Sequence, residues 1–267
     1  VVLPVPIGGT GDSMLMSDPR ILYHQLHHEK PIYGGYESDQ FYPEGTQTYF
    51  LNMFHMKGSN NDIIKQDLAI HGLALFDYFD IKYVTLHKEL TSPNREARIM
   101  QLMSEILNEN IPIYEDSKMV VYKIPKPNSL EPFLLLGSDW NHFKNCKGEI
   151  EKIHDCNARA TTKNSEILIV NPTNSDMGIT LNLVLSSVEN KKMMTVSVNN
   201  EKLNTFDIPT IPTNIQIENL ILVSGVNVVT LDTDEFTLFQ GKTVISSQSG
   251  IPYDMAIFVV KSISIIN

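Results

Sequence analysis

The chain has 267 residues, and its 21 lysines and arginines are outnumbered by 31 aspartates and glutamates, which gives a formal net charge of -10. Nucleic acids and anionic membrane surfaces are bound through clustered Lys and Arg, so this composition argues against both kinds of partner. No apolar run approaches the roughly 20 residues that a membrane helix needs, and no signal peptide pattern is present, so the sequence predicts a soluble chain. Its length has room for two domains, each with its own core.

The N-terminal part of the chain alternates between short apolar stretches and turns. The apolar stretch 1–7 contains two prolines, which favour an edge strand over a central one. It lacks an initiator Met, and we therefore expect a fragment of a longer protein or a processed product. An Asp-Pro start signal predicts a helix over 20–28, and recurring apolar residues predict another over 60–79.

The segment 76–124 organises the first part of the chain. Strands are predicted at 81–86 and 119–124, which are rich in β-branched and aromatic residues. Between them Ser92 and Pro93 open a helix, whose apolar positions recur at helical spacing: Ile99, Met100, Met103, Ile106 and Leu107. A crossover of this length usually places its two strands in one sheet, with the helix covering a face. We therefore predict an N-terminal α/β or α+β domain with a mixed sheet over residues 1–127.

Beyond Ile124 the composition changes. Pro125–Ser129 has the composition of a linker, and helical periodicity then nearly disappears. Short alternating stretches predict strands at 166–170, 179–186, 193–198, 215–222, 226–231 and 255–265. This spacing is typical of an antiparallel β-sandwich of the jelly-roll or immunoglobulin-like kind, so we predict an all-β domain over residues 128–267.

A serine esterase of the GDS type is the most specific enzyme hypothesis. Ser13 ends a Gly-Asp-Ser sequence after an apolar strand, Asn60 could donate to an oxyanion, and Asp139 with His142 forms an Asp-x-x-His pair that could activate the serine. Against it, prolines interrupt the preceding strand, and strand–helix alternation stops before the Asp-His pair. The alternative is that this Gly-Asp-Ser sequence is a turn.

Histidine and cysteine pairs in the sequence raise the question of a metal site or a disulfide. His24 and His28 are four residues apart on one predicted helix, but the segment lacks the Glu of a zinc-protease motif. Cys146 and Cys156 could close a short disulfide loop in an oxidising compartment, or remain two free thiols. Neither pattern matches a standard metal site, and we predict no metal ion and no cofactor.

Two further features have alternative interpretations. Trp140 is the only tryptophan, and either stacks on sugar rings or packs as an anchor near the domain boundary. Glu115 and Asp116 lie between two predicted strands. Adjacent strand residues point to opposite faces, so this pair is interpreted as a solvated hairpin turn without a catalytic role.

Several segments carry a family resemblance. The segment 23–36, YHQLHHEKPIYGGY, resembles the pattern Tyr-Tyr-Gln-x-x-His-Gly-Lys-Pro-Ile-x-Gly-Gly-Tyr. This pattern follows the last membrane helices of certain prokaryotic, chiefly archaeal, polytopic proteins. Those proteins are similar to type C glycosyltransferases, the mannosyltransferases that depend on dolichyl phosphate mannose. The segments 79–88, 113–122 and 136–140 are similar, in the same order, to a strand, a Tyr-Glu-Asp hairpin and a Gly-x-Gly-Trp motif of that family. Glu29 departs from the pattern, which has Gly there.

The resemblance implies a location and a function. The catalytic acid of that family lies in an N-terminal membrane-proximal loop that this chain lacks, so the chain would be a non-catalytic extracytoplasmic module attached to the transmembrane part of the same protein. It would bind or position glycan, lipid-linked sugar or a surface-layer protein. The positions that match the shared segment are its candidate contacts: Gln25, His28, Lys30, Gly34, Gly35 and Tyr36. The alternatives are the esterase and a free-standing carbohydrate-binding or structural cell-surface protein.

Overall fold

The computed structural model describes residues 1–5, 54, 62–108, 111–128, 130–140, 158–161, 164–187, 190–233 and 258–266. The chain divides into two compact units, which part between Glu131 and Pro132. The described residues 62–66 also belong to the second unit, although the chain on either side of this stretch belongs to the first.

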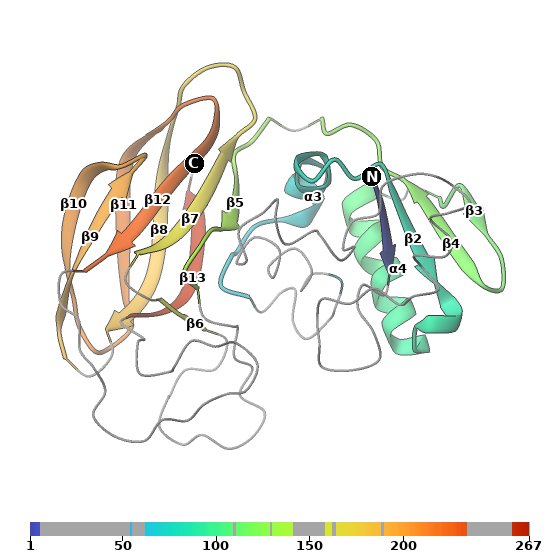
Figure 1. Ribbon diagram of the computed structural model, residues 1–267, viewed down its shortest axis with the longest axis horizontal. Helices are drawn as coiled ribbons and strands as arrows, with labels where there is room; N and C mark the ends of the chain where they lie inside the picture. Colours follow the sequence, from blue (N-terminus) through green and yellow to red (C-terminus); the bar gives the residue numbers. More distant parts are fainter. Residues whose placement is uncertain are drawn as a thin grey trace. The chain divides into compact units, whose positions relative to one another are not determined.

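The described part of the first unit combines helices with one sheet (Figure 1). Its elements in chain order are β1 (Val2–Val5), α3 (Leu68–Tyr78), β2 (Tyr83–His87), the 3-10 turn η3 (Lys88–Leu90), α4 (Pro93–Leu107), β3 (Tyr114–Glu115) and β4 (Met119–Lys123). The four strands lie in the order β1-β2-β4-β3. β1 runs parallel to β2, whereas β2 with β4 and β4 with β3 are antiparallel.

Local sequence signals define both helices. The Asp67 carboxylate accepts a hydrogen bond from the backbone N–H of Ala69 at 2.9 Å and so caps the start of α3. α4 begins with Ser92 as its N-cap and Pro93 in its first turn, and it ends at Asn108, which adopts a left-handed φ of 49°.

A glycine sits where the two helices meet. An added Cβ at Gly72 of α3 would lie 2.7 Å from Cγ1 and 2.8 Å from Cγ2 of Ile106 on α4. Real Cβ atoms do not approach so closely, and the Cβ of Ile106, which no change of rotamer moves, would itself lie only 3.2 Å away. The absence of a side chain at Gly72 therefore lets α3 and α4 pack together.

The structure corrects one expectation in this unit and refines others. The helix expected over 60–79 begins only at Leu68, because Asp67 caps it and residues 62–66 are not helical. β1 is the edge strand of the described sheet, and Pro4 lies within it. The strands expected at 81–86 and 119–124 correspond to β2 and β4, which are direct antiparallel neighbours.

The second unit is a sandwich of two mainly antiparallel sheets. Its elements are β5 (Phe133–Leu136), β6 (Arg159–Ala160), β7 (Asn164–Asn171), β8 (Met177–Ser187), β9 (Lys192–Val198), β10 (Glu201–Ile208), β11 (Thr213–Leu222), β12 (Gly225–Asp232) and β13 (Phe258–Ile266). One sheet has five strands in the order β10-β9-β12-β7-β5, and the other has four in the order β11-β8-β13-β6. In Figure 1, β9 and β12 lie in one layer and β8 and β13 in the other.

Alternating burial fills the space between the layers. Met194 and Val196 of β9 are fully buried, as are Leu181, Leu183 and Leu185 of β8, while the residues between them are more exposed. This alternation is what a half-buried antiparallel strand requires. Two strands depart from this alternation: all four residues of β5 are buried, and so are residues 167–171 of β7.

Each strand expected in the second unit has a counterpart, although residues 255–257 lie outside the described part of the chain. Three further strands were not anticipated: β5, β6 and β10. The second unit is thus an all-β antiparallel sandwich.

Candidate functional site

The register of the five-stranded sheet brings eight hydrogen-bonding side chains together on one face. Directly opposite residues point to the same face of a sheet, and so do residues two apart along a strand. One row runs across four strands through Thr205, Thr195, Asp232 and Asn164. The adjacent row runs through Lys202, Ser197, Thr230 and Glu166. We name these eight residues the polar face.

The polar face is the outward side of this sheet. On β9 the intervening residues Met194 and Val196 are buried, and on β12 so are Val229 and Leu231. A bulge between Lys202 and Asn204 absorbs one residue of β10, so that both of its members keep to the same face. Asn164 and Lys202 are exposed, and the other six members are half-buried.

The turns at one end of this sheet are fixed by two side-chain amides, the buried Asn227 and the exposed Asn199. Asn227 donates to the carbonyl oxygens of Val223 at 2.8 Å and Gly225 at 3.2 Å, and its Oδ1 accepts from Val223 N–H at 2.9 Å. Asn199 donates to the same Oδ1 at 3.1 Å. Asn199 and Asn200 take φ values of 49° and 70°, which Asn tolerates well in a tight hairpin. The strands that carry the polar face are therefore held in a defined register.

Glu166 connects the polar face to Trp140. The backbone carbonyl of Glu166 accepts the indole N–H of Trp140 at 2.5 Å, and its Oε2 accepts Ser138 N–H at 3.2 Å. Trp140 is only 8% exposed. The geometry fits the packing interpretation of Trp140, because a ring that stacks on a sugar needs an open face. Asp139, beside it, has a φ of 63°, and its carbonyl accepts a hydrogen bond from the Ser165 hydroxyl.

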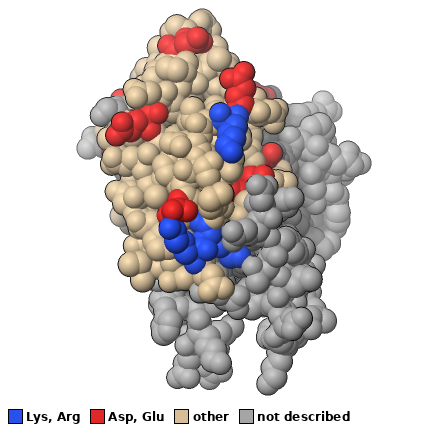
Figure 2. All heavy atoms as spheres, turned by 90° about the vertical axis from the view of Figure 1, so that its left-hand side faces the viewer, with Lys and Arg blue, Asp and Glu red and all other residues tan. Residues whose placement is uncertain are grey.

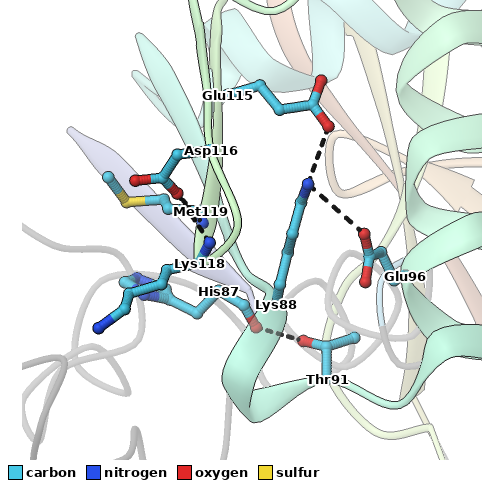
Figure 3. A network of polar contacts seen from close by, with 8 residues as sticks. All are labelled: His87, Lys88, Thr91, Glu96, Glu115, Asp116, Lys118 and Met119. Carbon is cyan, nitrogen blue, oxygen red and sulfur yellow. Dashed lines mark hydrogen bonds and ion pairs between the residues drawn. The ribbon is translucent and has the colours of Figure 1, made fainter.

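A second polar cluster lies in the first unit (Figure 3). Lys88 Nζ donates to Glu115 at 2.8 Å and lies 3.8 Å from Glu96, and its side chain is 18% exposed. The hydrogen bond with Glu115 raises the pKa of Lys88. Across the hairpin, Asp116 Oδ1 accepts the backbone N–H groups of Lys118 at 2.8 Å and Met119 at 2.7 Å.

These contacts account for both acids of the hairpin. The Tyr114 hydroxyl donates a hydrogen bond to Asp116 at 2.6 Å, and this bond is the main cause of the lowered pKa of Asp116. The two backbone N–H donors lower this pKa further. Glu115 and Asp116 are therefore engaged in holding the hairpin and its neighbour η3. Their arrangement supports the interpretation of this pair as a structural turn.

Most of the sequence-predicted site residues lie outside the described part of the chain. These are Ser13, His24, Gln25, His28, Lys30, Gly34, Gly35, Tyr36, Asn60, His142, Cys146 and Cys156. Asp139 and Trp140 are the members of those predictions that the structure describes. The polar face was not anticipated as a site, because it depends on pairings between distant strands.

Charge is sparse on the side of the second unit shown in Figure 2. Charged side chains form a few separate groups on an otherwise uncharged surface, and the basic groups have acidic groups beside them. Lys191 and Asp207 of the second unit form an exposed ion pair at 2.6 Å. Among the described residues no group of His, Cys, Asp and Glu could hold a metal ion, and no helix there is long and apolar enough to cross a membrane.

Comparison with known proteins gives structural neighbours only. No family model and no curated protein matches the chain. A family 35 carbohydrate-binding module from an environmental isolate aligns with 15% identity and a TM-score of 0.31, over 49% of this chain and 86% of its own. CBM35 from Cellvibrio japonicus Abf62 aligns with 13% identity and a TM-score of 0.33, over 51% of this chain and 94% of its own. A ruminal GH26 endo-beta-1,4-mannanase aligns with 12% identity and a TM-score of 0.29, over 50% of this chain and 25% of its own. At these TM-scores the likeness carries no argument about what this chain binds.

Proposed function

We propose that this chain is a non-catalytic module that binds carbohydrate through the polar face of its second unit. The observation that carries the proposal is the pair of adjacent rows that sets hydroxyl, carboxylate, amide and ammonium groups side by side on regular strands. Each sugar hydroxyl both donates and accepts hydrogen bonds, so a surface that mixes these groups matches a polyol.

The physical setting of the polar face favours such binding. Its half-buried members lie on paired strands, so their backbones are already ordered, and all of them except Glu166 are short side chains that lose little rotamer freedom when a ligand binds. Each hydrogen bond made in exchange for water contributes only about 1 kcal/mol, so a ligand that spans both rows is needed. We expect modest affinity, and preference for an oligosaccharide over a monosaccharide.

The test is a double substitution on adjacent rows, Thr195→Val with Thr230→Val. Both changes keep the side-chain shape and remove one hydroxyl each, so we expect at least about 10-fold weaker binding to whichever oligosaccharide the wild-type chain takes from an array of neutral and uronic acid-containing glycans. The affinity is measured by isothermal titration calorimetry, and the Trp140 fluorescence of the variant is compared with wild type to check that the second unit is folded.

Thr213→Val is the matched control. Thr213 is also half-buried, but it lies on β11 in the other sheet, opposite Leu185. This variant should bind as wild type does. The proposal is wrong if the wild-type chain retains no glycan from the array, or if the double variant and the control bind equally well.

We propose further that the module acts on the extracytoplasmic face of a membrane, as part of a glycosyltransferase-like protein whose transmembrane part is its partner. The support is the family resemblance of separate segments, two of which form β2 and the β3–β4 hairpin. Glycan or a surface-layer protein would be the external partner. Hydrophobic spans encoded upstream of Val1 would support this context, and a start codon directly before Val1 would contradict it.

A further inference from the structure

A short segment ahead of α3 bridges both sheets of the second unit. We name residues 62–66 the strap. On one side it pairs with β13: Ile64 forms a parallel bridge with Ile263, Lys65 N–H donates to the Ile263 carbonyl at 2.8 Å, and Ile263 N–H donates to the Ile63 carbonyl at 2.7 Å. This is the edge of β13 that also pairs with β6, on the side away from β8.

On the other side the strap reaches the five-stranded sheet. Gln66 Nε2 donates to the Leu134 carbonyl at 3.1 Å, and Leu134 N–H donates to Gln66 Oε1 at 3.0 Å. The side-chain amide thus pairs with β5 as a strand residue would. β5 is the edge strand of the described sheet. The strap therefore hydrogen-bonds the Leu134 N–H and C=O groups, which face away from β7.

A buried ion pair anchors the start of the strap. Both carboxylate oxygens of Asp62 accept from the Arg159 guanidinium of β6, Oδ1 from Nε at 2.9 Å and Oδ2 from Nη2 at 2.7 Å. The side chains are 2% and 1% exposed. Loss of the Asp62 carboxylate would remove two charge-assisted hydrogen bonds from the buried Arg159 guanidinium, and breaking a buried ion pair in this way is strongly destabilising. Ile63 and Ile64 are buried as well, so the strap contributes apolar contacts in addition to its polar ones.

We propose that the strap is an integral strand of the second unit that closes the sandwich along its β5–β13 side, and that opening of this side requires release of the strap as one piece. The strap protects the amides of Leu134 and Ile263, which lie in different sheets. Because one segment protects both, release of the strap as a whole would expose the two amides together.

Native-state hydrogen exchange on the full-length chain tests this inference. We expect Asp62→Asn to raise the exchange rates of the Leu134 and Ile263 amides together, by about 100-fold or more, while amides in the middle of β8 change less. Asp207→Asn is the matched control, because it breaks an exposed pair of similar length, 2.6 Å, with Lys191. The control should alter the same two rates by less than about 3-fold.

A milder variant covers the case in which Asp62→Asn does not fold. Gln66→Ala should raise exchange at Leu134 about 10-fold and leave the Trp140 fluorescence native. Complete unfolding of the second unit by Asp62→Asn, with the helical signal of the first unit retained, would also support an integral strap. Wild-type exchange at both amides in Asp62→Asn, or faster exchange at only one of them in that variant, would overturn the proposal. No sugar is used, so failure here is distinct from failure of the carbohydrate proposal.

Discussion

Gly72 shows how a single residue can set the distance between two helices. Alanine in place of glycine inside a helix ordinarily stabilises a protein by about 0.4–1 kcal/mol, because the unfolded chain loses freedom. At Gly72 the added Cβ would meet Ile106 at 2.7 Å, so α3 and α4 would have to move apart. Overpacking of this kind costs about 1–3 kcal/mol.

We therefore expect Gly72→Ala to lower the free energy of unfolding of the first unit by about 1–2 kcal/mol, whereas glycine-to-alanine changes inside helices usually raise it. The measurement is urea unfolding followed by circular dichroism at the helical minimum, since the described helices lie in this unit. Gly178→Ala in β8 is the control, because its nearest neighbour would be Ile221 Cδ1 at an ordinary 3.8 Å. A stabilised Gly72→Ala variant would show that the helices are not in close contact at this point.

At the scale of elements, the sequence predicts those whose signals are local. Ser92 and Pro93 with a helical apolar pattern predict α4, and alternation of apolar and polar residues predicts β8, β9 and β12. The start of α3 was placed too early for a physical reason. Ile63 and Ile64 extend the apolar pattern of the helix, but they are buried against the sandwich through pairing with Ile263, a contact that no local pattern encodes.

The unanticipated strands have equally specific causes. β5 is four apolar residues buried on both faces, a pattern that does not distinguish a strand from a helix. The bulge after Lys202 breaks the alternation of β10, so its period is hidden. The polar face could not be predicted from the sequence for a related reason, because Thr195 and Asp232 become neighbours only when β9 pairs with β12. β9 and β12, each taken alone, show only ordinary alternation.

At the scale of the whole molecule, the two units are interleaved along the chain. The sequence shows the linker Pro125–Ser129, and the described residues 125–128 form no helix or strand. From the sequence alone, we would expect a cut in this linker to separate two independent domains. However, the strap comes from the N-terminal side of that linker, and its buried ion pair with Arg159 belongs to the second unit.

This leads to a prediction for a chain that carries a specific protease site after Asn128. Cleavage should give two fragments on a denaturing gel that still migrate as one species in native size exclusion, because the strap remains docked between β5 and β13. Addition of Asp62→Asn should release the fragments from one another, since the anchoring charge pair is then lost. Asp207→Asn, which breaks only the surface pair with Lys191, should leave them together. Prompt separation of the unmodified halves after cleavage would mean that the strap does not hold the second unit, and that the linker alone joins the two parts of the chain.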